Sequence, residues 1–440
     1  METSKKTGRI PELDGLRVLM IFIVSWFHIW QQSWLEPSFT VGETPFSLDH
    51  IVRSGYVWVD ATILLSAFLM LLPLARKQAA GGTTPTESFS AREFYLRKAR
   101  RILPGYWFIV LVVFIGICLP WDLYYGNGPY IVKDLFTHFT LIFPFWRDTY
   151  IYTPLGAASW TLAVVALGYL LFPLIIRSLQ KHPVRVLCTM AGSAFAFRAW
   201  CLWGLTDYAM VVNTFVNFLD VYALGFASAM IYARLENRWS RYCQSSGHPS
   251  ADAEKHIPTT GTTFLNAKAE QDSWLADSAP PNRKHVILWQ ILATVVFFGC
   301  LAGVFELQRV QAYSSFHAEL QGRQMILRPA FALAFAGLIL SAPFSLKPLR
   351  KLLGNRVTAF LAAISMNYYL IHQTLAVHMR RIGFPVSVSE TPNMAGEQPW
   401  QTQYTLLAFG LSIAAAVLVT YLIEKPAGKW LKRKFGSHTR

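Results

Sequence analysis

Ten blocks of predominantly apolar residues run along this chain of 440 residues. They cover residues 16–34, 55–74, 104–121, 157–176, 184–205, 208–233, 286–305, 326–344, 357–377 and 404–423. A helix needs roughly 20 apolar residues to cross a hydrocarbon core of about 30 Å, and each block is close to that length. Because 53% of the residues are hydrophobic and only 15% are charged, a water-soluble fold would have too little polar surface. The pattern predicts an all-α, polytopic membrane bundle of about ten transmembrane helices.

Lysine and arginine are distributed unevenly between the segments that join these blocks. If the N-terminus is cytoplasmic, the cytoplasmic segments hold 31 of the 40 Lys and Arg residues, whereas the outer loops and helix rims, including Arg328, hold 8. Cytoplasmic loops of membrane proteins carry such an excess. We therefore expect a multi-pass protein of the cell membrane with both termini cytoplasmic. Topology and contact with lipid headgroups then explain the net charge of +15, and no nucleic-acid binding is expected.

One membrane domain is expected to take up most of the chain. We expect a cytoplasmic N-terminus at residues 1–15, the transmembrane domain at 16–423 and a basic cytoplasmic tail at 424–440. Within the domain, residues 234–284 are polar and poor in aliphatic side chains, which predicts a flexible cytoplasmic loop. The aromatic segment 122–156 contains an apolar run too short to cross the membrane, which predicts a re-entrant or interfacial element.

Five ionisable side chains fall inside the predicted spans, where charge is costly. They are His28, Asp60, Arg198, Asp220 and His372. Arg198 and Asp220 lie on adjacent spans, so we expect them to pair with each other. Asp60 has three possible environments: beside a catalytic base, bound to an arginine, or in contact with water near the outer end of its span. His372 fits either a structural hydrogen bond or a place in a binding pocket.

His28 has the most informative position of these five. It lies twelve residues past Leu16, very roughly 18 Å from the cytoplasmic face at the rise of an α-helix. An imidazole titrates near neutrality and can take a proton from a hydroxyl nucleophile, so His28 is a candidate general base. The alternative is a histidine that packs between helices and bonds to a neighbouring serine or tyrosine. Its depth alone does not separate these interpretations.

The segment that precedes His28 favours the catalytic interpretation. Residues 9–17 read R-I-P-E-L-D-G-L-R, and His28 follows Arg17 by eleven residues. This combination resembles the opening signature of the acyltransferase-3 family. Its members are polytopic proteins, typically of ten helices, that move acyl groups, often acetyl, from cytoplasmic acyl-CoA to sugars or other hydroxylated acceptors. The resemblance implies that His28 is the catalytic base, with Asp60 as a candidate acid beside it.

Further motifs follow in the order of the family and extend the resemblance over nearly the whole chain. The second helix carries Val59, Asp60, Leu65, Ser66, Phe68 and Leu69. Residues 97–104, R-K-A-R-R-I-L-P, resemble the arginine-rich element that enters the third helix. Later matches are Trp160-Thr161-Leu162 with Y-L-L-F-P at 169–173, then Ser365, Tyr369, Leu370 and His372, and finally I-E-K-P at 423–426.

The resemblance implies a coenzyme A site at the cytoplasmic mouth of the bundle. Guanidinium and ammonium groups pair well with phosphates, although the positive-inside rule alone would also place arginines here. The candidate donor-binding residues are Arg97, Lys98, Arg100, Arg101, Asp14 and Arg17. Asp14 and Arg17 are expected to form a structural ion pair that also positions the donor. Four further residues are expected to shape the pocket: Ser66, Trp160, Tyr169 and His372.

Two departures from the family pattern bear on the mechanism. The glutamates of the W-S-L-S-V-E-E motif are replaced by Val165 and Ala166. In the second helix, Ser66-Ala67 stands for serine-glycine and Thr62-Ile63 for a phenylalanine pair. If the glutamate orients the catalytic histidine in other members, another acid such as Asp60 must replace it here, or the reaction must differ. Loss of that acid also allows a catalytically impaired protein.

The leading hypothesis is a membrane-embedded acyltransferase that takes an acyl group, in the first place acetyl, from acyl-CoA. The acceptor is expected to be a hydroxyl of a sugar, a cell-surface glycan precursor or a small metabolite. A rival is a transporter or exporter in which His28, Arg198 and Asp220 form a path for protons or a polar substrate. Another is an impaired, acyltransferase-like sensor. No metal is expected, since the five cysteines show no Cys-x-x-Cys pairing.

Overall fold

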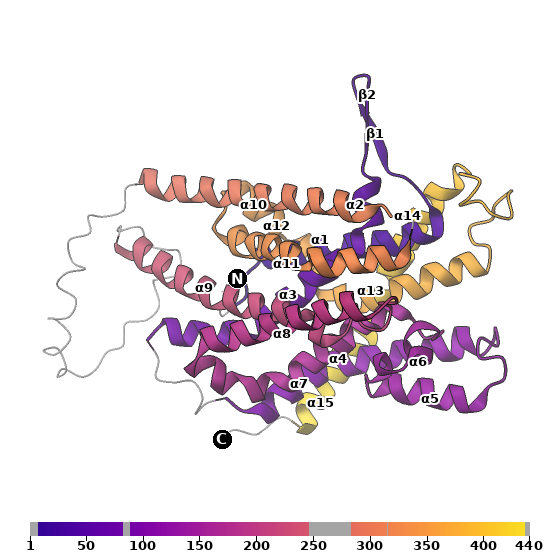
Figure 1. The fold of residues 1–440 in the computed structure, drawn as a ribbon, viewed down its shortest axis with the longest axis horizontal. Coiled ribbons are helices and arrows are strands. Elements are labelled where there is room, and N and C mark those ends of the chain that lie inside the picture. Colours follow the sequence, from indigo (N-terminus) through magenta and orange to yellow (C-terminus); the bar gives the residue numbers. More distant parts are fainter. Residues whose placement is uncertain (1–7, 82–88, 246–282, 315, 436–440) are drawn as a thin grey trace, which may run out of the picture.

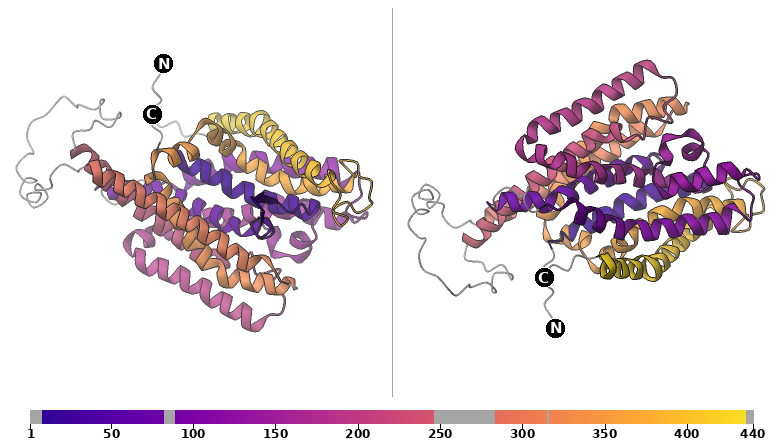
Figure 2. Two further views of the ribbon diagram at one scale, coloured as in Figure 1. Left: turned by 90° about the horizontal axis from the view of Figure 1, so that it is seen from above. Right: turned by 90° about the horizontal axis from the view of Figure 1, so that it is seen from below.

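The structure, a computed structural model, describes residues 8–81, 89–245, 283–314 and 316–435. In this part of the chain, ten long helices lie side by side (Figures 1 and 2). They are α1 (Glu12–Ser33), α3 (Trp58–Ala79), α4 (Ala91–Val113), α7 (Trp160–Lys181), α8 (Pro183–Gly204), α9 (Leu219–Ser245), α10 (Arg283–Ala312), α11 (His317–Ser341), α13 (Arg356–Arg381) and α14 (Trp400–Leu418). Each predicted apolar block lies largely within one of them.

Shorter elements connect the long helices. The short α-helices between them are α2 (Asp49–Arg53), α5 (Gly128–Phe139), α6 (Arg147–Ile151) and α12 (Lys347–Leu353), and a further short helix, α15 (Lys425–Phe435), follows the last long helix. A π-helical segment, Val419–Glu424, joins α14 to α15. Strands β1 (Ser38–Val41) and β2 (Thr44–Ser47) pair antiparallel as a hairpin that projects from the bundle (Figure 1). The sequence did not predict this hairpin.

Nine helical segments of the described chain are long and apolar enough to cross a membrane. The remaining long helix, α13, has the length but buries polar side chains, among them Ser365, Asn367 and His372. It packs against α1 and α14, which shield these side chains from lipid. The protein is therefore a multi-pass helical membrane bundle, as predicted.

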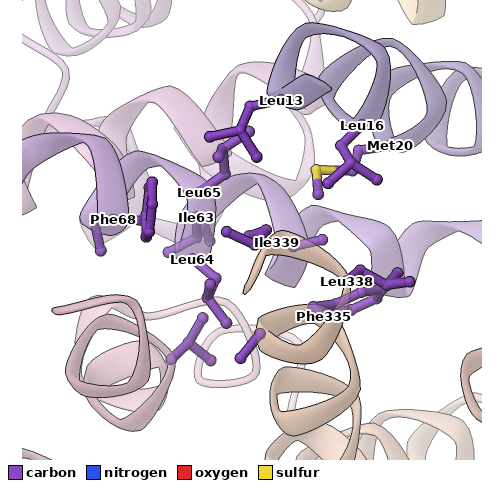
Figure 3. Close-up of a cluster of buried hydrophobic side chains, with 14 of the residues drawn as sticks. Leu13, Leu16, Met20, Ile63, Leu64, Leu65, Phe68, Phe335, Leu338 and Ile339 are labelled. Carbon is purple, nitrogen blue, oxygen red and sulfur yellow. The ribbon is translucent and has the colours of Figure 1, made fainter. Parts of the chain in front are cut away.

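Helix α3 forms the centre of the bundle. It contacts α1, α7, α9 and α11, and its apolar side chains interlock with theirs. Figure 3 shows part of this core, built from Leu13, Leu16 and Met20 of α1, Ile63, Leu64, Leu65 and Phe68 of α3, and Phe335, Leu338 and Ile339 of α11. By contrast, α8 and α10 lie at the periphery (Figure 2), and few of their residues are buried. Because α3 is central, its motif residues between Val59 and Leu69 are held among the neighbouring helices.

Two buried ion pairs lie next to each other in the bundle. Arg198 Nη2 is 2.6 Å from Asp220 Oδ1, which confirms the expected pair. Arg328 Nε is 2.9 Å from Asp60 Oδ2. The backbone carbonyl of Asn217 accepts hydrogen bonds from both arginines, at 2.6 and 3.5 Å. Since a buried charge is tolerated only with a partner, these pairs hold α3, α8, α9 and α11 in one arrangement.

Two helices extend farther than the apolar pattern indicated. Arg328 was expected at a helix rim, but α11 begins at His317, so Arg328 lies inside the helix and is fully buried. Helix α9 continues to Ser245, into the segment expected to be a loop, and Glu236 there forms an ion pair with Arg76. Residues 246–282 of that expected loop lie outside the described residues.

The aromatic segment after α4 forms its own small unit at one end of the bundle (Figure 1). Its centre is the buried carboxylate of Asp134 on α5, which accepts hydrogen bonds from the hydroxyls of Tyr124 and Thr153. Val132 and Phe136 project from the opposite face of α5 and are 69% and 60% exposed. Exposed apolar side chains on a short amphipathic helix suit the membrane interface that was expected here.

Candidate active site

A cavity of about 430 Å³ lies where five helices meet. Its walls come from α1, α3, α4, α7 and α13, and they carry basic, hydroxyl-bearing and apolar side chains. The basic residues Arg17, Lys98 and Arg101 line it, together with six residues that carry hydroxyl groups. The hydroxyl residues are Thr62, Ser66, Thr161, Tyr169 and Ser365, and a sixth, Tyr369, is discussed below. This arrangement can hold a long anionic molecule inside an otherwise apolar bundle.

The helix period explains why separate motifs of the sequence meet at this cavity. On α1, Ile21 lines the cavity and His28 lies two turns farther along the same face, about 10 Å away. On α13, Tyr369 lines the cavity, and its ring centre is 5.5 Å from that of His372. Helices α1 and α13 pack together, so the two histidines become neighbours beyond the cavity.

His28 and His372 have ring centres 5.3 Å apart. His372 Nδ1 lies 2.7 Å from the backbone carbonyl of Tyr369, and a carbonyl can only accept, so Nδ1 carries the proton. Its Nε2 is buried and has no hydrogen-bond partner among the described residues. His28 Nδ1 lies 3.1 Å from Gln31 Oε1, which likewise makes Nδ1 the donor. Both rings therefore keep the lone pair of Nε2 available as a proton acceptor.

One of the basic residues, Lys98, is held at the cavity by a contact with an aromatic ring. Lys98 Nζ lies 4.2 Å from the ring centre of Tyr169, and the Tyr169 hydroxyl is 3.1 Å from that of Ser66. A second hollow, of about 510 Å³, shares Lys98 with the cavity and adds Arg97 to its wall. Arg100 differs, because its Nε donates to the carbonyl of its own helix at Leu96. Three of the four clustered cations, Arg97, Lys98 and Arg101, therefore line a hollow.

The acyltransferase-3 family model, described as an acyltransferase domain, matches residues 10–425 of this sequence. The chain belongs to the acyltransferase-3 family. No curated protein and no solved structure matches it. Because the match covers nearly all of the chain, the cavity and the two histidines lie within the acyltransferase domain.

Asp60 occupies a different place from the one assigned to it as a candidate acid of this acyltransferase. Its carboxylate is buried and bound to Arg328, so the expectation of contact with water is wrong and that of an arginine partner is confirmed. The group that bonds to the His28 ring is the amide of Gln31. The sequence contained a signal for this contact, since positions three apart on a helix share a face.

Asp14 forms its ion pair with Arg9, at 2.6 Å, and not with Arg17 as expected. The reason is the position of Arg17, which turns into the cavity beneath Ile21. Arg17 is thereby free to face an anionic ligand, whereas Asp14 fixes the chain just before α1. The pair predicted from their proximity in the sequence does not form, and Arg17 lines the cavity instead.

The cavity wall also shows what stands at the position of the missing glutamate. Val165 lines the cavity and contributes only methyl groups. One turn earlier, the Thr161 hydroxyl lies 2.7 Å from that of Tyr369, and both residues line the cavity. Trp160 stacks on Phe218 with ring centres 5.9 Å apart and supports this end of α7 from behind. The polar side chains that α7 contributes to the cavity wall are therefore the hydroxyls of Thr161 and Tyr169, and no carboxylate of the described residues lines the cavity.

Proposed function

We propose that the protein transfers an acyl group, acetyl in the first place, from cytoplasmic acyl-CoA to a hydroxyl group of an acceptor. The acceptor class is a sugar, a cell-surface glycan precursor or a small metabolite. The observation that carries the proposal is one cavity with cations in its wall and two histidines beyond it, each with a free Nε2. The excess of Lys and Arg in the segments expected to be cytoplasmic supports donor binding from that side of the cell membrane.

The donor would bind with its phosphates at Arg17, Lys98 and Arg101. Charge-assisted hydrogen bonds of this kind are strong, particularly in surroundings with little water. The thioester arm would then extend along the hydroxyl-lined wall toward Tyr369 and His372. Arg97 in the adjoining hollow would extend the same positive field.

The reaction needs one proton acceptor and one group that stabilises negative charge. His28 Nε2 takes the proton of the acceptor hydroxyl as its oxygen attacks the thioester carbon. The carbon–sulfur bond then breaks, and the same proton passes from His28 to the sulfur, so that the products are the acyl ester and free coenzyme A. The hydroxyls of Thr161 and Tyr369 are placed to donate a hydrogen bond to the oxyanion in the wall of the cavity.

The test compares purified protein variants in their transfer of radiolabelled acetyl from acetyl-CoA to candidate acceptors. His28→Ala is expected to abolish transfer, because no other group in the proposed scheme removes the proton. His378→Ala provides a matched control, since His378 lies on α13 but does not line the cavity and contacts Trp121 edge to face. Transfer by His28→Ala at the wild-type rate would refute the assignment of the base.

The transport alternative depends on charged residues that are free to exchange a proton or substrate. Arg198 and Asp220 are instead bound to each other, with Asn217 completing the shell around the guanidinium. They also come from α8 and α9, which do not line the cavity. Uptake of a solute by reconstituted vesicles without any acetyl transfer would favour transport, and acyl-CoA binding without either activity would favour a sensor.

A further inference from the structure

A third hollow, of about 440 Å³, lies between α1, α13 and α14. Its lining is almost entirely apolar, in contrast to the mixed lining of the catalytic cavity. It extends along α1 from Val18, near the beginning of the helix, to Leu35, just past its end. We call it the lateral groove. Its length follows the helix axis and therefore the thickness of the membrane.

The lateral groove opens toward the region that lipid occupies. Two of its residues, Phe22 of α1 and Leu406 of α14, are 42% and 66% exposed on the surface of the bundle. Both helices belong to the segments that can cross a membrane. Phe22 stacks on Phe409 with ring centres 5.0 Å apart, so aromatic side chains form part of its wall. A molecule dissolved in the bilayer can reach this groove without passing through water.

The inner wall of the groove is also a wall of the active site. Ile21 and Ser365 line both the lateral groove and the catalytic cavity. Tyr368, another groove residue, stacks on His372 with ring centres 5.8 Å apart and an angle of 12° between the planes. Its hydroxyl is bonded to that of Ser25 at 2.8 Å. One layer of side chains therefore separates a molecule in the groove from the histidine pair.

We propose that the lateral groove holds the hydrophobic body or tail of an acceptor alcohol dissolved in the bilayer, whose hydroxyl reaches the catalytic cavity between Ile21 and Ser365. The inference rests on the proposed acyl transfer and narrows its acceptor to an alcohol with a long apolar part. A free sugar would bring several hydroxyls against walls that offer almost no hydrogen-bond partners, which is costly. An alkyl or polyprenyl chain meets no such cost.

Photolabelling of the full-length protein in lipid nanodiscs tests the groove without depending on catalysis. The probe is a long-chain primary alcohol with a diazirine in mid-chain, and its methyl ether is the matched control probe. We expect the alcohol to label the groove faces of α1, α13 and α14 several-fold more than the ether does, because only the alcohol can place a hydroxyl at Ser365. Equal labelling by both probes would show that bulk lipid fills the groove and would overturn the proposal.

A pair of tryptophan variants on one helix tests access through the groove. Leu406→Trp fills the groove, whereas Leu411→Trp adds the same bulk to α14 at another exposed position, 40% exposed and outside the groove. Leu406→Trp should reduce labelling by the alcohol to the level of the ether and lower acetyl transfer to dodecanol, but not to butanol. Retained transfer to butanol shows that the variant is folded. Equal effects of both variants on acetyl transfer to dodecanol would overturn the proposal.

The same nanodiscs separate this inference from the proposed function. If the wild-type protein transfers acetyl from acetyl-CoA to no alcohol of any length, the acyl-transfer proposal fails. Hydroxyl-dependent labelling that Leu406→Trp removes would still support the groove as a site for bilayer-dissolved alcohols. If transfer occurs but is independent of chain length and of Leu406, acyl transfer stands and access through the groove is refuted.

Discussion

Replacement of Asp60 by alanine is expected to destabilise the bundle by about 3–5 kcal/mol, the cost of leaving one member of a buried ion pair without its partner. The side chains of Arg328 and Asp60 are 0% and 2% exposed, and Nε lies 2.9 Å from Oδ2. Water therefore cannot replace the lost carboxylate. The remaining hydrogen bonds of the guanidinium, from Nη1 to the carbonyls of Val212 at 3.0 Å and Asn217 at 3.5 Å, are with neutral groups.

Removal of both charges should cost less than removal of one. The double variant Asp60→Ala with Arg328→Met is expected to recover most of the lost stability, because no unpaired charge remains in the bundle. Lys133→Ala is the matched control, since the Lys133–Asp148 pair is 40% and 43% exposed and such pairs contribute about 0–1 kcal/mol. The free energy of unfolding is measured in mixed detergent for the purified wild type, the two Asp60 variants and Lys133→Ala. If Asp60→Ala is as stable as Lys133→Ala but has no transfer activity, the structural role of Asp60 is refuted and a chemical role is supported.

Three further substitutions test the site and its framework. Gln31→Leu removes one hydrogen bond to the catalytic ring, about 1 kcal/mol, and should lower kcat about fivefold in steady-state assays without changing the KM for acetyl-CoA. Arg101→Ala should raise the KM for acetyl-CoA about tenfold or more, whereas Lys432→Ala on α15 should leave it unchanged. Equal effects of the two variants would leave only a topological role for the basic cluster at residues 97–101. Gly105→Ala would place a Cβ 2.5 Å from Asn367 Oδ1 and should lower the free energy of unfolding by about 1–3 kcal/mol in the same assay. A variant with wild-type stability would contradict the close approach of α4 and α13.

Hydropathy predicted the helices well because the membrane imposes a single length on every span. The partnership of Arg198 and Asp220 was also predictable, since a charge inside the bundle requires a counter-charge and few were available. Arg328 escaped the same reasoning because its apolar block begins only at residue 326, although α11 starts at His317. A helix can extend well beyond its apolar part, so a block marks the span more reliably than the helix.

Side-chain direction was the part of the site that the sequence could not provide. Asp14 and Arg17 lie one turn apart, yet one turns to Arg9 and the other into the cavity. The hydroxyl pair of Thr161 and Tyr369 joins helices far apart in the sequence, and no local sequence pattern predicts this contact. Some residues of the family motifs, among them Arg17, Ser66 and Tyr169, line the cavity, but the packing of α1, α7 and α13 decides which side chains touch.

The combination of Val165 and Gln31 bears on whether the acyl group passes through the enzyme. Since His28 Nδ1 donates to Gln31, an acyl group on Nε2 would make the ring a cation. Gln31 cannot take the remaining proton, and Val165 leaves the cavity wall without the carboxylate that would balance a lasting positive charge. In direct transfer the ring is charged only while it carries the proton from the acceptor oxygen to the leaving sulfur. For the proposed reaction we therefore expect direct transfer and no acyl-histidine intermediate, because a neutral amide orients the histidine.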